Sequence, residues 1–293
     1  MKVSTLAVSA GVLAILFATA CNRAHHDRPD HPRLTPNVVM RDVTFKSASL
    51  ERDMSYRVIM PARIPPGGHG LPVVYLLHGG GGEYRNWSNY TDVAQYAEKG
   101  LILVMPQGDE SYYTNSAERP QDRYEDYIAK DLIADVESHF PAAPGRGNRA
   151  IVGVSMGGFG AVKLALKHPD LYAVAGGISS ALDVPTRPFS IRRYSQWRHH
   201  RSIFGPWKGT VQKANDPFVL AQTADPATTP YMFLTCGDKE GLLPANGSFA
   251  SLLERRHFRH EFHVVKGAHN WNQWNEQLPA CFQRIFERMA IHM

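Results

Sequence analysis

The feature that most constrains the fold is a serine placed between glycines at the end of an apolar run. The stretch "RAIVGVSMGGFG" (149–160) starts with residues suited to a buried strand and continues, after Ser155, with small residues suited to the start of a helix. Gly153 and Gly157 stand where a side chain would collide across a sharp turn. We therefore predict a strand–turn–helix unit that exposes the Ser155 hydroxyl. The alternative is a glycine-rich turn whose serine has no chemical role.

Short apolar runs alternate with helix-like segments along most of the chain. Two antiparallel strands are predicted within 38–60. The buried strands after them are expected at 72–77, 101–106, 149–154, 171–179, 230–236 and 261–266. Helices are expected at 91–99, 125–139, 157–168, 246–258 and 271–291. This alternation predicts an α/β fold in which a mostly parallel, doubly wound sheet is covered on both faces.

One connection, 182–229, is longer than a single crossover helix requires, and connections of this length commonly form lids or substrate walls. No repeat or second linker divides 38–293, so we predict a single domain with a lid-like insertion. The insertion interleaves aromatic residues with arginines, namely Tyr194, Trp197, Arg192, Arg193, Arg198 and Arg201. Such a surface would suit an acidic or sugar-bearing ester, but a solvated basic surface is the favoured interpretation.

A glycine-rich stretch earlier in the chain complements a serine nucleophile. "YLLHGGGG" (75–82) follows a predicted strand and supplies flexible backbone where an oxyanion hole needs a donor. We predict that Gly80 provides this donor together with the amide of Met156, which directly follows the serine. The alternative is a glycine loop that only turns the chain.

Two later stretches supply an acid and a histidine. "CGDKEGLLPAN" (236–246) offers Asp238 or Glu240, and "GAHNWNQW" (267–274) offers His269 in a loop. A single histidine is more often a surface or packing residue, so its assignment depends on its order and placement. The order serine, acid, histidine along the chain is that of the α/β-hydrolases.

Residues 1–20 have the pattern of an export signal, because Lys2 precedes an apolar stretch that is too short to span a membrane. The stretch ends "FATAC", which resembles the lipobox where bacterial lipoproteins are cleaved and acylated on the cysteine, here Cys21. Ala18 replaces the usual leucine, so ordinary secretory cleavage is the alternative. The predicted location is the bacterial cell envelope, with membrane attachment through lipidated Cys21, or otherwise the periplasm or the medium.

The segment 21–37 is polar and rich in proline, which predicts a flexible tether. Three of its residues are histidines, His25, His26 and His31. A solvated linker is favoured over a metal site here, because no cysteine or carboxylate framework surrounds these side chains.

Charge and cysteine content add two limits. Removal of the signal takes away Lys2 and no acid, so the formal net charge falls from +5 to +4. This excess is too small to indicate nucleic-acid binding. Cys236 and Cys281 remain as possible disulfide partners, and the sequence leaves their pairing open.

Together these stretches resemble the esterase D branch of the α/β-hydrolases, which includes S-formylglutathione hydrolases, feruloyl and acetyl-xylan esterases, and the mycolyl-transferase antigens of mycobacteria. The likeness runs from about Val43 to Phe286 and also includes "YRVIMP", "SYYTNS" and "YEDYIAKDLIADVE". The resemblance implies an α/β-hydrolase fold with Ser155 as nucleophile, His269 as base and Glu240 as acid. Glutamate departs from the aspartate of many esterases but is similar to the mycolyl transferases.

The predicted function is hydrolysis of carboxylic esters through an acyl-enzyme on Ser155. This chemistry needs no metal and no organic cofactor, and the expected partner is an ester substrate such as an acylated sugar or an aromatic ester. Two alternatives stay open. The first is acyl transfer to a sugar or lipid hydroxyl, and the second is a catalytically silent binding or envelope protein on the same fold. The serine, acid, histidine and glycine loop together weigh against the second.

Overall fold

The structure is a computed structural model that describes residues 29–64 and 70–291. The chain divides into two units, Met1–His31 and Pro32–Met293. The predicted export signal and residues 21–28 of the predicted tether, Cys21 among them, lie outside the described residues. All the described strands and helices belong to the second unit.

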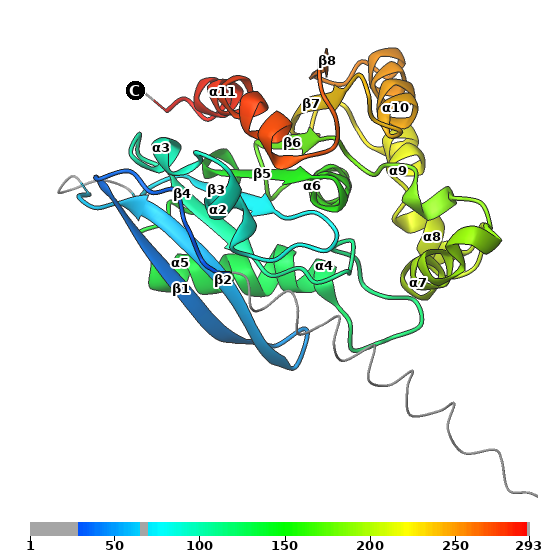
Figure 1. Ribbon diagram of the computed structural model, residues 1–293, viewed down its shortest axis with the longest axis horizontal. Coiled ribbons are helices and arrows are strands. Elements are labelled where there is room, and N and C mark those ends of the chain that lie inside the picture. Colours follow the sequence, from blue (N-terminus) through cyan, green and yellow to red (C-terminus); the bar gives the residue numbers. More distant parts are fainter. Residues whose placement is uncertain (1–28, 65–69, 292–293) are drawn as a thin grey trace, which may run out of the picture. The chain divides into compact units, whose positions relative to one another are not determined.

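The second unit is built on one eight-stranded sheet in the order β1-β2-β4-β3-β5-β6-β7-β8 (Figure 1). The strands are β1 (Val38–Ser47), β2 (Arg52–Pro61), β3 (Val73–Leu77), β4 (Ile102–Pro106), β5 (Arg149–Val154), β6 (Val174–Ile178), β7 (Tyr231–Gly237) and β8 (His260–Val265). β1 pairs antiparallel with β2, and β2 with β4. All the other pairings are parallel, which confirms the predicted mostly parallel sheet.

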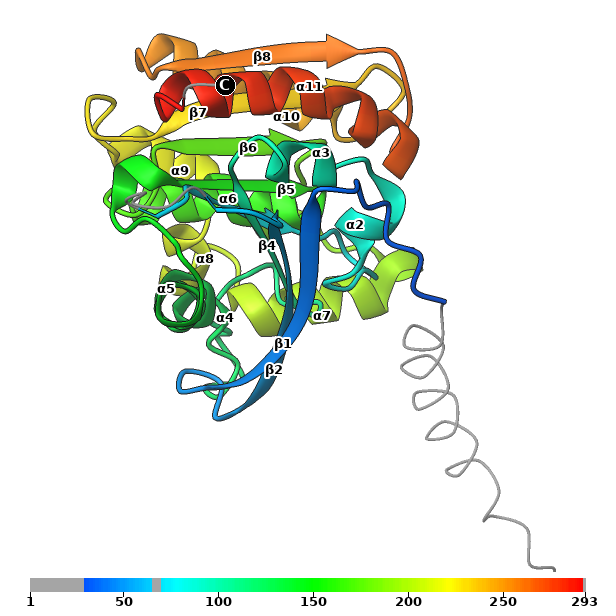
Figure 2. The ribbon, with the colours of Figure 1, turned by 90° about the vertical axis from the view of Figure 1, so that its left-hand side faces the viewer.

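Helices cover both faces of this sheet (Figure 2). They are α2 (Asn86–Tyr90), α3 (Ala94–Ala97), α4 (Tyr124–Asp126), α5 (Leu132–His139), α6 (Met156–Lys167), α7 (Tyr194–Phe204), α8 (Thr210–Ala214), α9 (Pro217–Thr223), α10 (Leu243–Arg255) and α11 (Trp271–Arg288). A π-helical turn, Tyr127–Asp131, joins α4 to α5. Alternation along the strands explains the two layers, since successive side chains point to opposite faces. Tyr75 and Leu77 pack in the core with α5, α6 and α10, whereas Val74 and Leu76 pack with α3 and α11.

The connection between β6 and β7 differs from the predicted lid-like insertion in one respect. It is largely helical, and α9 belongs to the domain core, because Ala221 is buried and the rings of Phe218 and Phe249 lie 5.3 Å apart. Earlier in the same connection, Phe189 and Trp207 are exposed. The part that stands out from the core is therefore the start of α7 with the loops on either side of the helix, whereas the end of α7 is anchored in the core by Ile203 and Phe204. Helix α9 serves as the crossover helix.

The segment just before β1 lies against the domain. Arg33 N donates to Ser88 O at 2.8 Å, and the Arg33 guanidinium is 3.3 Å from Asp92. Asn37 N donates to a carboxylate oxygen of Glu98 at 3.1 Å. The ordered domain thus begins several residues earlier than the predicted boundary at 38, because these backbone and side-chain groups find partners on α2, α3 and the loops beside them.

Two further observations concern the cysteines, whose pairing the sequence leaves open, and the lengths of the helices. Cys236 and Cys281 are both buried and both free, so the structure contains no bond between them. Over residues 29–64 and 70–291, no helix has the length and apolar character needed to cross a bilayer.

Candidate active site

Ser155 lies at the junction of β5 and α6 in a conformation that residues with a side chain seldom adopt. Its φ is 56° and its ψ is −113°. The backbone is held on both sides, because Ser155 N donates to Ile178 O at 2.9 Å and Ser155 O accepts from Phe159 N and Ala181 N, each at 3.0 Å. The structure therefore contains the strand–turn–helix unit that the sequence predicts.

Distances across this turn explain the neighbouring glycines. A Cβ on Gly153 would lie 2.1 Å from the carbonyl carbon of Gly157, and a Cβ on Gly157 would lie 2.2 Å from Leu77 O. Both distances are far below the roughly 3.5 Å at which non-bonded atoms come into contact. On Gly158 a Cβ would lie 2.4 Å from Ser180 Oγ, in the loop after β6. Gly153 and Gly157 accept no side chain without movement of the backbone around the serine, and at Gly158 a side chain would displace the Ser180 hydroxyl.

His269 stands between the serine and a buried carboxylate. Its Nε2 is 2.9 Å from Ser155 Oγ, and its Nδ1 is 2.6 Å from Glu240 Oε2. The Glu240 side chain is 1 % exposed and the His269 side chain 39 % exposed, so the acid is shielded while the imidazole remains accessible. The Trp274 ring packs edge-to-face on the imidazole with centroids 4.9 Å apart. The three groups come from the loops after β5, β7 and β8, at one edge of the parallel sheet.

The second oxygen of Glu240 is held by two further donors. Oε1 accepts from Ser179 Oγ at 2.6 Å and from Gly237 N at 2.9 Å. Trp274 Nε1 donates to Ser179 Oγ at 3.0 Å, which leaves the Ser179 proton for the carboxylate. Burial acts to raise the pKa of Glu240, but the hydrogen bonds from His269, Ser179 and Gly237 outweigh it and lower that pKa below its usual range. Glu240 is therefore ionised and aimed at Nδ1 of His269.

Asp238, the alternative acid, has a different position. It is exposed, and its Oδ1 accepts from Gly267 N at 3.0 Å. Lys239 N donates to Gly267 O at 3.1 Å, so the turn after β7 is bonded to the loop that carries His269. Asp238 therefore positions the histidine loop, while Glu240 makes the contact with the imidazole.

Two backbone segments beside Ser155 offer N–H groups. Met156 begins α6, where the first N–H groups of a helix have no acceptor within it. Gly79 lies across the turn, since a Cβ there would be 3.3 Å from Ser155 Cβ, and the next residue, Gly80, is exposed. Both predicted oxyanion donors, Gly80 and Met156, thus belong to segments that adjoin the serine.

A buried histidine holds the glycine loop in place. His78 Nε2 accepts from Gly108 N at 2.9 Å, so the ring proton is on Nδ1, which donates to Gly79 O at 2.8 Å. Burial lowers the pKa of His78, in agreement with a neutral ring. Tyr113 donates to His78 O at 2.9 Å. Neither these two residues nor Ser179 and Trp274 are predicted from the sequence, because each acts through contacts between distant segments.

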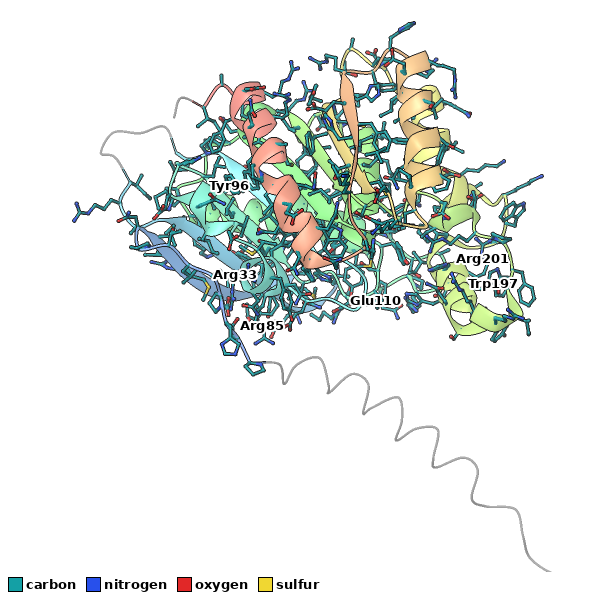
Figure 3. The ribbon with its side chains drawn as sticks, turned by 45° about the horizontal axis from the view of Figure 1, so that its top comes forward. Arg33, Arg85, Tyr96, Glu110, Trp197 and Arg201 are labelled. Atoms are coloured by element: carbon teal, nitrogen blue, oxygen red, sulfur yellow. The ribbon has the colours of Figure 1, made fainter. Side chains whose placement is uncertain are left out.

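Glu110 connects the glycine loop to the insertion after β6. Its carboxylate accepts from Gly81 N, and its carbonyl accepts from His199 Nε2 at 2.7 Å. Figure 3 shows Glu110 beside the α7 segment that carries Trp197 and Arg201. In the part of the chain that the structure describes, no cluster of three or more His, Cys, Asp or Glu residues could hold a metal ion.

The protein has a serine, an imidazole and a buried carboxylate in hydrogen-bond contact at the carboxyl ends of parallel strands. This arrangement is typical of serine hydrolases with the α/β-hydrolase fold. Comparisons with known proteins agree. The model of the Esterase family matches residues 47–285, which is more than half of the 293 residues. The chain belongs to this family.

Relatives span nearly the whole domain at low identity. An acetyl esterase of Caldicellulosiruptor saccharolyticus is 23% identical over 260 residues, covering 84% of this chain and 97% of that protein. The diacylglycerol acyltransferase/mycolyltransferase Ag85A of Mycobacterium leprae is 25% identical, covering 83% and 81%. The solved structure of the fluorophosphonate-binding serine hydrolase FphF of Staphylococcus aureus has a TM-score of 0.74 at 24% identity, covering 85% and 98%. The protein is a serine ester hydrolase.

Proposed function

We propose that the enzyme cleaves carboxylic esters with Ser155 as nucleophile, His269 as general base and Glu240 as the orienting acid. This proposal rests on the continuous chain of hydrogen bonds from Ser155 Oγ through both nitrogens of His269 to Glu240. The Glu240 carboxylate accepts a hydrogen bond from Nδ1–H of His269, which keeps the proton on Nδ1, so Nε2 presents its lone pair to the serine hydroxyl.

The reaction then proceeds in two halves. Ser155 Oγ attacks the ester carbonyl as its proton passes to His269 Nε2, and the ionised Glu240 stabilises the imidazolium that forms. The imidazolium returns the proton to the departing alcohol, which leaves an acyl group on Ser155. In the second half, His269 takes a proton from water, whose oxygen attacks the acyl carbonyl, and returns it to Ser155 as the acid departs.

We place the carbonyl oxygen against the amides of Gly80 and Met156. Negative charge develops on that oxygen in both halves of the reaction, and pre-positioned N–H donors stabilise it. The N-terminus of α6 adds a favourable dipole for the same charge.

The test is covalent labelling with a fluorophosphonate followed by peptide mapping. We expect a single adduct on Ser155 in the wild-type protein and none in Ser155→Ala. A folded wild-type protein that resists labelling would support the silent scaffold, and an adduct on another serine would overturn the assignment.

Acyl transfer is the second candidate, because Ag85A, a transferase by name, aligns with most of the chain. Both reactions share the acyl-enzyme and differ only in what attacks it. Hydrolysis is favoured because it requires no acceptor site. Incubation with an acetyl ester in the presence of sugar or glycerol acceptors decides the matter: hydrolysis yields free acetate at every acceptor concentration, whereas a transferase yields acylated acceptor in its place. Acylated sugars and aromatic esters are the substrates we propose to screen.

We also propose that the protein is exported by its N-terminal signal and anchored through a lipid on Cys21, with the segment after it as a tether. The support is the sequence "FATAC" and the polar stretch after it. Wild-type protein should then fractionate with membranes, and Cys21→Ser should be released. A wild-type protein found wholly in the soluble fraction would instead support ordinary secretion.

A further inference from the structure

A cavity lined mainly by residues of the insertion between β6 and β7 lies apart from Ser155. It has a volume of about 640 Å³, within the range of about 300 to 1,000 Å³ that small-molecule sites occupy. Aromatic and arginine side chains dominate its lining, including Phe189, Trp197, Trp207, Arg187, Arg198 and Arg201. None of its lining residues is Ser155, His269, Glu240 or part of the glycine loop.

Helix α7 separates this cavity from the glycine loop. Trp197 and Arg201 are four residues apart and share one face of the helix, which lines the cavity. His199 lies on a different face and donates to Glu110, the residue bonded to the glycine loop. The cavity and the catalytic serine are thus on different sides of α7.

The three arginines of the cavity differ in their partners. Arg187 is paired with Asp183 at 2.8 Å, and Arg198 with Glu118 at 3.5 Å. Among the described residues Arg201 has no carboxylate partner, although it is only 8% exposed. Its Nη2 donates to Pro185 O at 3.0 Å, and its Nε is buried without a partner.

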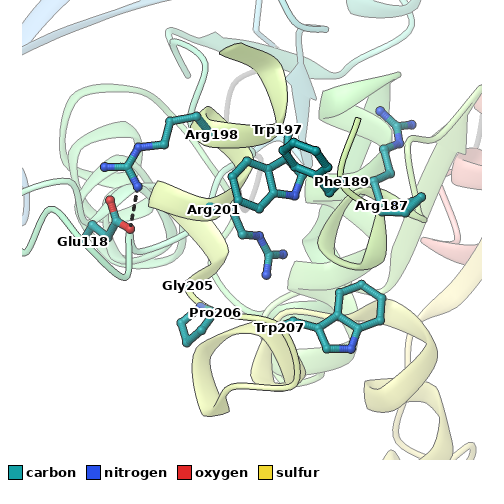
Figure 4. A pocket seen from close by; sticks show the side chains of 10 residues that line it. Glu118, Arg187, Phe189, Trp197, Arg198, Arg201, Gly205, Pro206 and Trp207 are labelled. Carbon is teal, nitrogen blue, oxygen red and sulfur yellow. Dashed lines mark ion pairs between the residues drawn. The ribbon is translucent and has the colours of Figure 1, made fainter. Parts of the chain in front are cut away.

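An unpaired, buried guanidinium needs an explanation, since burial of a charge without a counter-charge is unfavourable. Burial lowers the pKa of Arg201, and no neighbouring carboxylate offsets this. Figure 4 shows the Arg201 guanidinium beside the space that the indoles of Trp197 and Trp207 border. The missing anion would therefore sit in the cavity, with aromatic rings around it.

We propose that this cavity binds an aromatic carboxylate, with the carboxylate on Arg201 and the flat ring between Trp197 and Trp207. The guanidinium fork matches a carboxylate, and indole rings stack on planar apolar groups. A small inorganic anion would leave the aromatic walls uncovered. A neutral sugar would find few free polar partners, because Glu118 and Arg198 already bind each other. The ligand would be a remote part of a large ester substrate or a separate regulatory molecule.

The test measures binding of 4-hydroxycinnamate by calorimetry, with the neutral methyl amide of the same acid as the matched probe. The protein is the full chain after fluorophosphonate has blocked Ser155, so binding at the catalytic serine does not contribute. We expect one site for the acid and at least about tenfold weaker binding of the amide, given the strength of charge-assisted hydrogen bonds.

Variants locate the site. Arg201→Gln should weaken binding of the acid at least about tenfold and make acid and amide nearly equal. Trp207→Ala should also weaken it, and this variant keeps the test valid if Arg201→Gln unfolds, because Trp207 is 54% exposed. Arg193→Gln is the control: it removes the same charge from the same segment, is exposed, and does not line the cavity.

The outcomes separate this proposal from the catalytic one. Three results would overturn the cavity assignment: the blocked protein does not bind the acid, it binds acid and amide equally, or Arg193→Gln and Arg201→Gln lose binding equally. None of these results would affect the labelling of Ser155. A further assay uses unblocked protein and esters that carry a remote aryl carboxylate. Faster hydrolysis of these esters by the wild type, with the advantage lost in Arg201→Gln through a change in KM and not in kcat, would identify the ligand as part of the substrate. No such difference, with binding retained, would identify a separate regulatory molecule.

Discussion

Two buried glutamates are linked to opposite ends of α6, Glu240 through His269 and Ser155, and Glu125 through lysines of the helix itself. The charges of the two glutamates are compensated differently. At the N-terminal end, Glu240 is bonded through His269, a hydroxyl and an amide, none of which carries a permanent charge. In the C-terminal half, the Glu125 carboxylate lies 2.8 Å from Lys163 Nζ and 2.7 Å from Lys167 Nζ. A third group, His168 Nε2, is 3.1 Å from the same carboxylate.

This difference shows what a carboxylate needs in order to assist a reaction. Glu125 is paired with two lysines, so its compensation does not depend on a proton transfer during the reaction. In the proposed mechanism, Glu240 instead faces an imidazole that gains a positive charge when it takes the serine proton, and the attraction between the two groups grows at that step. We infer that the Glu125 cluster stabilises the fold and the Glu240 cluster supports catalysis.

Ser155→Ala should have the largest effect on the catalytic half of this comparison. Turnover of a p-nitrophenyl ester should fall by at least about a thousandfold, because the nucleophile is lost. The melting temperature should stay close to that of the wild type, since alanine fits the same turn. A variant that retained a tenth of wild-type turnover would remove Ser155 from the role of nucleophile.

Glu240→Gln should have the next largest effect on activity. The change keeps the shape of the side chain but removes the charge that orients and stabilises His269, so kcat should fall roughly a hundredfold or more. Asp238→Asn is the matched control and should cost far less, because Asp238 bonds to Gly267 N and not to the imidazole. If Asp238→Asn were the crippling change, the two acids would have to exchange roles.

Glu125→Gln should act on stability instead. Loss of the carboxylate leaves Lys163, which is fully buried, without its counter-charge. The free energy of unfolding should drop by about 3 kcal/mol and the melting temperature by about 6 to 12 °C. Turnover per folded molecule should be unchanged. Glu287→Gln, which breaks an exposed pair with Arg284, is the control and should leave the melting temperature nearly unaltered.

Acidic pH should have the weakest effect. It should reduce both the stability that the Glu125 cluster provides and the activity that the Glu240 cluster supports. Burial acts to raise the pKa of Glu125, but Lys163, His168 and Lys167 hold it well below its usual range. A carboxyl group whose pKa is depressed on folding stabilises the protein above its unfolded pKa of about 4.3 and loses that contribution as pH falls below it. Chemical unfolding should therefore show stability declining below about pH 5, with a smaller decline in Glu125→Gln than in the wild type.

Activity should also depend on pH. His269 must be neutral to accept the serine proton, so kcat/KM should rise as the imidazole loses its proton and then level off. Turnover that declined steadily from mildly acidic to neutral pH in a protein that stays folded would contradict a histidine base.

The sequence predicts much of this arrangement because its signals are local. Apolar runs mark the parallel strands, and glycines mark the turn around Ser155, where added Cβ atoms would collide with backbone. The contacts of Ser179, Trp274 and His78 depend on loops from separate strands meeting in space, which no local pattern encodes. The pairing of Glu125 with Lys163 is of the same kind, since the two residues are 38 positions apart.

The central claim is that Glu240, and not the equally buried Glu125, activates Ser155 through His269. The most direct measurement is the rate of fluorophosphonate labelling at Ser155 in wild type, Glu240→Gln, Asp238→Asn and Glu125→Gln, at a temperature where all four are folded. We predict that Glu240→Gln slows labelling by about two orders of magnitude, while Asp238→Asn and Glu125→Gln react at nearly the wild-type rate. Wild-type labelling in Glu240→Gln, or an equal loss in Glu125→Gln, would contradict the claim.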